Sequence, residues 1–141
     1  MTPGPTARLP RSSRLITWMN GCCAAALAQI AERQKEYEMA EKQWRRAVAL
    51  APKQVGRLVD LAKFLARRGK YPESEGAFQQ ATKVEPNSRL VLYARAEAYV
   101  ETNRNLETAR DLLQQYLRSP LTPDDPSREE ARQLLKRASG E

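Results

Sequence analysis

Two stretches of the sequence decide its fold: YEMAEKQWRRAVALAP at residues 37–52 and YPESEGAFQQATKVEP at residues 71–86. When the two are superposed, they share a tyrosine, an aromatic residue, an alanine and a proline, namely Tyr37 and Tyr71, Trp44 and Phe78, Ala47 and Ala81, and Pro52 and Pro86. Every matched pair is separated by the same offset, which also carries Leu27 onto Leu61 and Ala28 onto Ala62. A constant offset of this length indicates an internal structural repeat.

The offset resembles the period of the tetratricopeptide repeat (TPR), whose units are about 34 residues long. We delimit three copies, residues 21–54, 55–88 and 89–122; the third matches more loosely, and its turn at residues 102–105 is one residue longer. The resemblance implies an all-α fold, a right-handed α-solenoid in which antiparallel helix pairs stack on one another. It also implies that Ala62 is buried between the two helices of the second copy, where only a small side chain fits.

The N-terminal segment differs in composition from the repeats. Residues 1–14 hold three Pro and three Arg and little that could bury surface, so we expect disorder there. Residues 15–20 begin an uncharged stretch and are expected to extend the first helix. Arginines ahead of such a stretch also resemble a secretory signal, and Met19-Asn20-Gly21-Cys22 resembles a bacterial lipoprotein cleavage site. Because polar residues interrupt the stretch, we predict a cytoplasmic protein, with an exported or membrane-anchored assembly factor of the cell envelope as the alternative.

The C-terminal segment, residues 123–141, is expected to form a capping helix and a short tail. Asp124 and Asp125 are acidic N-cap candidates, and Pro126 suits the first helical position. An apolar stripe with helical spacing follows over residues 126–138. A solenoid needs such a helix, because its last repeat otherwise leaves an apolar face uncovered.

The composition argues against catalysis and against bound cofactors. The 141 residues include no His, which removes the commonest general base and metal ligand. The only two cysteines, Cys22 and Cys23, are adjacent, and on a helix they point about 100° apart and cannot easily form a disulfide. A zinc site therefore has too few ligands, and neither a Gly-rich phosphate loop nor a nucleophile elbow is present. We predict a protein that is not an enzyme and holds no metal or cofactor.

The family resemblance also implies where a partner binds, since the first helix of each TPR lines a concave groove that holds a peptide or a partner's helix. We therefore predict a protein–protein interaction adaptor or scaffold whose partner is another protein. The implied groove residues are Gln29, Arg33, Val59, Lys63, Arg67, Leu90, Tyr93 and Glu97. Lys63 and Arg67 share a helix face, and together with Tyr93 they suit a ligand that carries an acidic and an apolar residue.

One TPR subfamily is a poor match. Modules that hold the acidic C-terminus of heat-shock chaperones use a clamp of Lys, Asn and Arg side chains for two carboxylates. At the five corresponding positions this chain has Ala25, Gln29, Asp60, Leu90 and Ala94. All five depart from the clamp, and the carboxylate of Asp60 would repel an acidic ligand.

The net charge of +7 leaves a further alternative, binding of nucleic acid or anionic lipid through basic residues. Candidates on the body of the chain are Arg45, Arg46, Arg67, Arg68 and Lys70. Aromatic residues that could stack on bases are not interleaved with them, so we rank this function below protein binding. The identity of the partner and the oligomeric state stay open.

Overall fold

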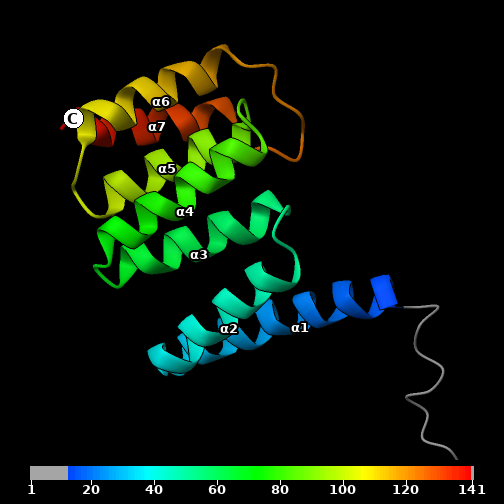
Figure 1. The fold of residues 1–141 in the computed structure, drawn as a ribbon. Coiled ribbons are helices and arrows are strands. Elements are labelled where there is room, and N and C mark those ends of the chain that lie inside the picture. The colour runs from blue at the N-terminus through cyan, green and yellow to red at the C-terminus, as the bar shows by residue number, and fades with distance from the viewer. Residues whose placement is uncertain (1–12, 141) are drawn as a thin grey trace, which may run out of the picture. The chain divides into compact units, whose positions relative to one another are not determined.

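The computed structural model describes residues 13–140, with side chains from residue 23 onward. This part of the chain is helical and contains no strand (Figure 1). Its helices are α1 (Ser13–Arg33), α2 (Tyr37–Leu50), α3 (Val55–Arg67), α4 (Tyr71–Val84), α5 (Arg89–Glu101), α6 (Leu106–Arg118) and α7 (Arg128–Ala138). The chain divides into two compact units, residues 1–57 and residues 58–141, each with its own packing.

The turn inside each helix pair recurs with the period of the sequence repeat. Lys35, Gly69 and Asn103 all adopt the left-handed backbone conformation, with φ of 61°, 79° and 54°. After each of them, an amide N–H donates to the carbonyl five residues back: Glu36 to Ala31 at 2.8 Å, Lys70 to Leu65 at 2.9 Å and Arg104 to Tyr99 at 2.9 Å. This bond is the mark of a Schellman motif, so α1, α3 and α5 end in the same way. The third turn has one extra residue, Asn105, which is also left-handed at φ 48°.

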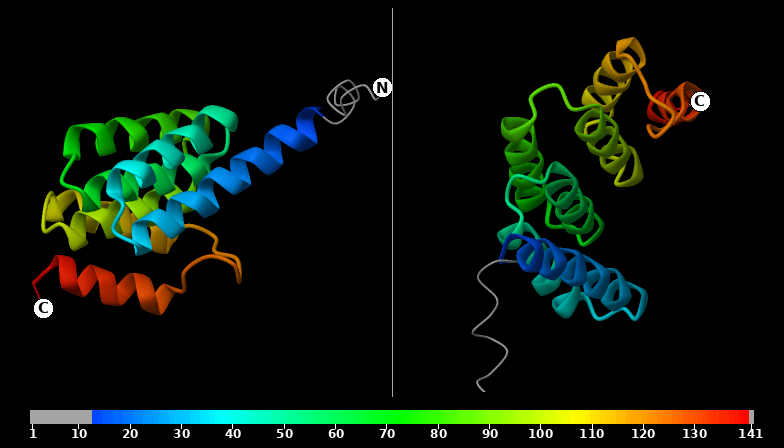
Figure 2. Two further views of the ribbon diagram at one scale, coloured as in Figure 1. Left: turned by 90° about the horizontal axis from the view of Figure 1, so that it is seen from below. Right: turned by 90° about the vertical axis from the view of Figure 1, so that its right-hand side faces the viewer.

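In the first unit, α1 and α2 form an antiparallel pair that lies side by side in both views of Figure 2. The contact is built from small side chains, because Ala28, Ala40 and Ala47 are all fully buried. Small residues let the two helix axes approach closely. Trp44 fills the space beside the alanines, and its indole Nε1 donates a hydrogen bond to Glu32 Oε1 at 2.8 Å.

The other face of α1 carries apolar side chains that are not buried. Leu27 and Ile30 are each 47% exposed, although Leu61 and Phe64, which occupy the same places in the next copy, are buried. Leu27 and Ile30 are three residues apart and share one helix face. A match to the repeat pattern therefore does not by itself place a side chain in the core.

In the second unit, the contact between α3 and α4 is as tight as the sequence predicted. Ala62 is fully buried, which confirms its expected position between the helices. Its carbonyl oxygen accepts a hydrogen bond from Ser74 Oγ at 2.7 Å, so the buried hydroxyl at a position usually held by alanine is satisfied.

Polar side chains join α4 to α5. Arg95 Nη2 donates to Glu75 Oε2 at 2.9 Å, and the Tyr99 hydroxyl donates to Glu75 Oε1 at 2.5 Å. Arg95 stands where the repeat pattern has leucine. The ion pair and hydrogen bonds with Glu75 take the place of the apolar contact that leucine would make.

The last three helices of this unit share one apolar cluster. Its buried members come from α5, α6 and α7: Ala96, Tyr99, Ala109, Leu113, Tyr116, Ala131, Leu134 and Ala138. Tyr116 is fully buried, and its hydroxyl donates to the carbonyl oxygen of Pro126 at 2.5 Å. That bond fastens the connection between α6 and α7 to the core.

The start of α7 differs from the expected one. Ser127, and not Asp124 or Asp125, is the N-cap residue: its side chain accepts from the Glu130 amide at 3.1 Å, and Glu130 Oε2 accepts from the Ser127 amide at 2.7 Å. This capping box satisfies two amide groups at once. Asp125 is instead engaged with Thr122 and Arg89, so it is not available as a cap.

The expectations for the N-terminal segment are only partly within the described residues. Residues 1–12 of the predicted disordered segment lie outside them, and α1 begins at Ser13. Cys23 is exposed and not disulfide-bonded, whereas the side chain of Cys22 lies outside the described part. Among the described residues, no helix combines the length and the apolarity that a membrane crossing requires.

Candidate functional site

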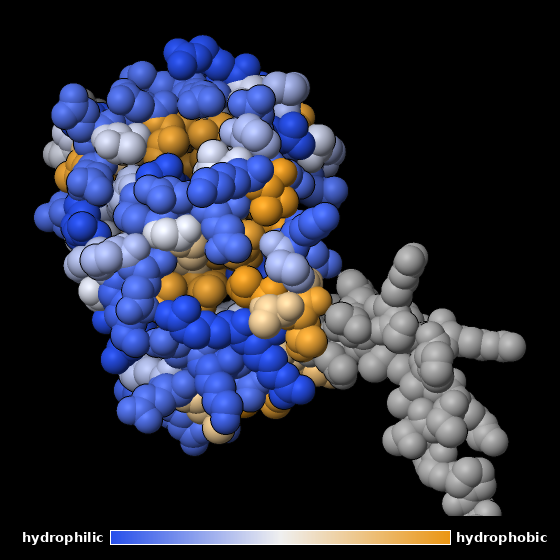
Figure 3. All heavy atoms as spheres, in the orientation of Figure 1, coloured by the Kyte–Doolittle hydropathy of each residue, from blue (hydrophilic) through white to orange (hydrophobic). Residues whose placement is uncertain are grey.

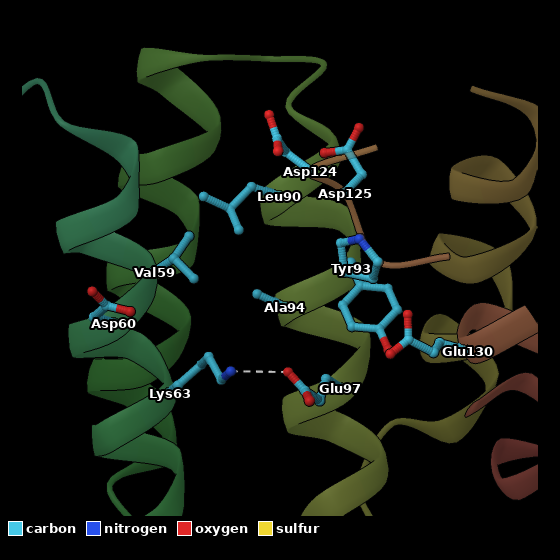
Figure 4. Close-up of a pocket in the computed structure, with 11 residues that line it drawn as sticks. Val59, Asp60, Lys63, Leu90, Tyr93, Ala94, Glu97, Asp124, Asp125 and Glu130 are labelled. Atoms are coloured by element: carbon cyan, nitrogen blue, oxygen red, sulfur yellow. Dashed lines mark ion pairs between the residues drawn. The ribbon is translucent and has the colours of Figure 1, made fainter. Parts of the chain in front are cut away.

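The surface shown in Figure 3 consists mainly of hydrophilic side chains, with apolar residues in narrow bands between them. Within the second unit, one pocket with a volume of about 460 Å³ opens between α3, α5 and the segment that leads into α7 (Figure 4). Its lining consists of Val59, Asp60, Lys63, Leu90, Tyr93, Ala94, Glu97, Asp124, Asp125, Pro126 and Glu130. We call these residues the α3–α5 pocket.

The floor of the α3–α5 pocket is apolar. Val59 and Ala94 are buried, at 3% exposure each, and they face one another from α3 and α5 in Figure 4. Leu90 lies one turn before Ala94 and is 44% exposed. The floor therefore offers apolar surface that a ligand could cover.

Tyr93 forms the side of the pocket nearest to α7. Its ring packs against the buried ring of Tyr116, with the centroids 5.2 Å apart and the planes tilted by 52°. Burial raises the pKa of Tyr93, and the carboxylates of Glu97 and Glu130 raise it further. The hydroxyl therefore stays protonated at neutral pH and can donate a hydrogen bond. The contact with Tyr116 holds the ring in place before any ligand arrives.

An ion pair closes the end of the pocket. Lys63 Nζ on α3 lies 2.9 Å from Glu97 Oε2 on α5, and both side chains are about 30% exposed (Figure 4). The two residues are one repeat period apart, so they occupy the same place in consecutive repeats. Because Glu97 already neutralises this ammonium group, Lys63 is a weaker attraction for an acidic ligand than its position in the sequence suggested.

The opposite wall is a loop segment fixed by hydrogen bonds. Asp125 Oδ2 accepts from the Thr122 amide at 2.9 Å, from Thr122 Oγ1 at 3.0 Å and from Arg89 Nε at 2.8 Å. The bond from the Thr122 amide is the largest of the effects that lower the pKa of Asp125. Next to it, Pro126 is held by the Tyr116 hydroxyl. The wall is thus tied both to α5 and to the core.

Acidic groups dominate the charge of the α3–α5 pocket. Five carboxylates line it, from Asp60, Glu97, Asp124, Asp125 and Glu130, against the single ammonium group of Lys63. The hydrogen bonds from the amide and hydroxyl of Ser127 lower the pKa of Glu130, so this group too is ionised at neutral pH. The pocket is negative on a chain whose net charge is +7.

Five of the eight residues predicted from the sequence line this pocket, namely Val59, Lys63, Leu90, Tyr93 and Glu97. Arg67 is exposed in the last turn of α3 and is not part of the lining. Gln29 and Arg33 are exposed on α1, in the first unit. Of the remaining lining residues, those from Asp124 to Glu130 could not be found from repeat positions, because they lie beyond the third copy.

The sequence matches the family described as the Cilia and flagella-associated protein 70 (CFAP70) middle TPR-like domain over residues 24–136. The chain belongs to this family. No curated protein matches this CFAP70-type TPR domain.

Solved structures with the same fold include two peptide-binding TPR domains. One, the "TPR2B-domain:pHsp70-complex of yeast Sti1", superposes with a TM-score of 0.71 at 20% sequence identity and covers 86% of this chain and 98% of that one. The other, the "First TPR of Spaghetti (RPAP3) bound to HSP90 peptide SRMEEVD", has a TM-score of 0.67 at 17% identity and covers 86% of this chain and 92% of that one. At these identities the likeness establishes the fold, so the all-α TPR solenoid predicted from the sequence is confirmed.

Proposed function

We propose that this CFAP70-type TPR domain is a non-catalytic adaptor that holds a segment of a partner protein in the α3–α5 pocket. The observation that carries the proposal is the half-exposed Leu90 on an apolar floor, beside a tyrosine ring that the core holds in place. A fixed aromatic ring next to uncovered apolar surface is the composition of an interface hot spot. Five of the predicted groove residues take part in this site, and Gln29, Arg33 and Arg67 are left outside it.

The two similar structures support this kind of function without specifying the ligand. Both are TPR domains in complex with a chaperone or a chaperone peptide. In the α3–α5 pocket, however, Asp60, Leu90 and Ala94 stand where a clamp for two carboxylates would need amide and basic side chains. We therefore propose the shared mode of binding, a segment held beside the first helices of the repeats, and a different ligand.

The family name suggests where the partner is to be sought. Cilia and flagella give the family its name, so we propose that the partner is a protein of that organelle. The acidic lining of the pocket disfavours a phosphate backbone at this surface, which leaves nucleic acid binding the weaker alternative.

The test is capture from a ciliated-cell extract followed by titration of variants against the recovered partner. Leu90→Ala and Tyr93→Ala should each weaken binding, Tyr93→Ala by about 30-fold if it is a hot spot of about 2 kcal/mol. Val84→Ala is the matched control, because Val84 is another exposed apolar residue of the same unit, 36% exposed at the end of α4, and does not line the pocket. Arg45→Glu, on α2, should also have little effect. Loss of binding from Arg45→Glu with none from Leu90→Ala or Tyr93→Ala would place the site elsewhere.

A further inference from the structure

We propose that the segment bound in the α3–α5 pocket is basic, with Arg or Lys side chains flanking an apolar residue. This inference rests on the proposed function and specifies its ligand. It differs from the expectation drawn from the sequence, in which Lys63, Arg67 and Tyr93 suit a ligand that carries an acidic and an apolar residue.

The first argument is the sign of the charge inside the pocket. Its lining holds five carboxylates and one ammonium group, although basic residues outnumber acidic ones over the whole chain, 24 to 17. Acidic groups therefore gather at this place against the overall balance. Complementary charge steers a partner to its site and excludes partners of the wrong sign.

The second argument is which of these charges are already compensated. Lys63 is paired with Glu97 at 2.9 Å, and Arg89 is paired with Asp125 at 2.8 Å. Asp124 is exposed in the wall, and Glu130 is exposed in the first turn of α7. Neither of these two described residues forms an ion pair, and Figure 4 shows Glu130 beside Tyr93 and Asp124 nearer to Leu90. Cationic groups of the ligand would bind at these two carboxylates.

The third argument is the apolar surface between these charges. A guanidinium group near Glu130 would lie beside the ring of Tyr93, and cations are attracted to the face of such a ring. An apolar residue of the ligand would then cover Leu90 and the floor formed by Val59 and Ala94. The geometry therefore suits a basic side chain next to an apolar one, in a segment only a few residues long.

The experiment uses the ¹⁵N-labelled full chain and three synthetic peptides of equal length that share the same leucines and differ only in their other residues, which are Arg, Ser or Glu. The Arg–Leu peptide should shift the amide signals of Leu90, Tyr93 and Glu130 and bind more tightly than the Ser–Leu peptide, and the Glu–Leu peptide should bind least. Higher salt should weaken the Arg–Leu complex, because the carboxylates of Asp124 and Glu130 are accessible to solvent.

Two charge-reversal variants separate the pocket from the rest of the surface. Asp124→Lys should weaken the Arg–Leu complex roughly fivefold, as expected for a charge at the rim of a site. Asp111→Lys is the matched control: Asp111 is exposed on α6, outside the pocket, so the same change in net charge should leave the affinity unaltered.

The outcomes distinguish this inference from the function on which it rests. If the Ser–Leu or Glu–Leu peptide shifts the same amides and binds as tightly as the Arg–Leu peptide, the pocket binds peptides but the basic ligand is wrong. If none of the three shifts these amides, both proposals fail. A variant without residues 1–12 serves as a further control. If the amide signals of Leu90 and Tyr93 change on this deletion, the arginines of residues 1–12 occupy the pocket, and the proposal of an external ligand is wrong.

Discussion

Adding one methyl group at Gly69 should destabilise the second unit, whereas adding one at Gly76 should stabilise it. Gly69 lies two residues after the last residue of α3 and has a left-handed φ of 79°, and a Cβ atom built there would meet no atom within 4 Å. The cost of Gly69→Ala is therefore purely conformational. A left-handed alanine costs about 1–2 kcal/mol, and the lower entropy of the unfolded chain offsets about 0.4–1 kcal/mol of this. We expect a net loss of about 1 kcal/mol.

Gly76 provides the matched control, since it lies in the middle of α4 in the same unit and a Cβ atom there also meets nothing within 4 Å. In a helix interior, alanine is more favourable than glycine by about 1 kcal/mol. The same chemical change should thus act with opposite sign at the two positions. Thermal unfolding followed by circular dichroism is the assay, and about 1 kcal/mol corresponds to a shift of about 4–8 °C for a unit of this size.

The equivalent turn of the first unit extends the test. Lys35 has the same backbone conformation as Gly69, with φ of 61°, but carries a side chain. Lys35→Gly should therefore stabilise the protein by up to about 1 kcal/mol. A melting temperature that rises for Gly69→Ala, or falls for Lys35→Gly, would refute the assignment of these residues to a repeating helix end.

Three further predictions follow from the packing and the ionisable groups. Ala62→Leu should lower the free energy of unfolding by about 1–3 kcal/mol in a urea titration, because Ala62 is fully buried between α3 and α4; an unchanged midpoint would contradict the repeat boundaries. Tyr116→Phe should cost about 1 kcal/mol and speed amide hydrogen exchange at Ser127 and Arg128, since it removes the hydrogen bond to Pro126; unaltered exchange would show that this bond does not hold the wall. The fold lowers the pKa values of Asp125 and Glu130 from 3.8 and 4.5, so stability should fall below about pH 4, where these carboxylates become protonated. Burial raises the pKa values of Tyr99 and Tyr116 above 10.0, so stability should also fall above about pH 10, where ionisation of the tyrosines favours the unfolded chain. A urea midpoint that stays constant across both limits would contradict these shifts.

The sequence predicted what the repeat period controls. The helix pairs, the burial of Ala62 and the longer third turn all follow from matching equivalent positions of successive copies. The left-handed conformation of Lys35 could not be predicted in this way, because lysine carries no preference for it. It becomes evident only beside Gly69 and Asn103, which occupy the same place in the other two turns.

The start of α7 was predicted two residues too early, although its signal was present in the sequence. Ser127-Arg128-Glu129-Glu130 has the spacing of a capping box, which satisfies two amides instead of one. Asp125 has the right chemistry for an N-cap, but its carboxylate forms an ion pair with Arg89, 36 residues earlier, and is not available to cap the helix. A local signal was thus overridden by a contact that no local pattern contains.

The acidic lining of the α3–α5 pocket could not be predicted from repeat positions for a related reason. Along the sequence, Lys63 and Arg67 stand out on one helix face, whereas the carboxylates that line the pocket come from three separate segments: α3, α5, and residues 124–130, which lead into the first turn of α7. The repeat period relates positions within copies and says nothing about Asp124, Asp125 and Glu130, which follow the last copy. Only the folded chain brings them to the lining of the pocket.

The place where the third repeat departs from its pattern is also the place where the pocket is built. Its second helix has Tyr116 where the first two copies have Ala47 and Ala81, and all three side chains are fully buried. An alanine at this position would let the two helices pack closely but would make neither an aromatic contact nor a side-chain hydrogen bond. The tyrosine ring instead packs against Tyr93, and its hydroxyl fastens Pro126. One substitution in the repeat therefore fixes both the aromatic side and the wall of the pocket. Departures from local rules with a clear compensating contact are expected at functional sites, and this one supports assigning function to the α3–α5 pocket.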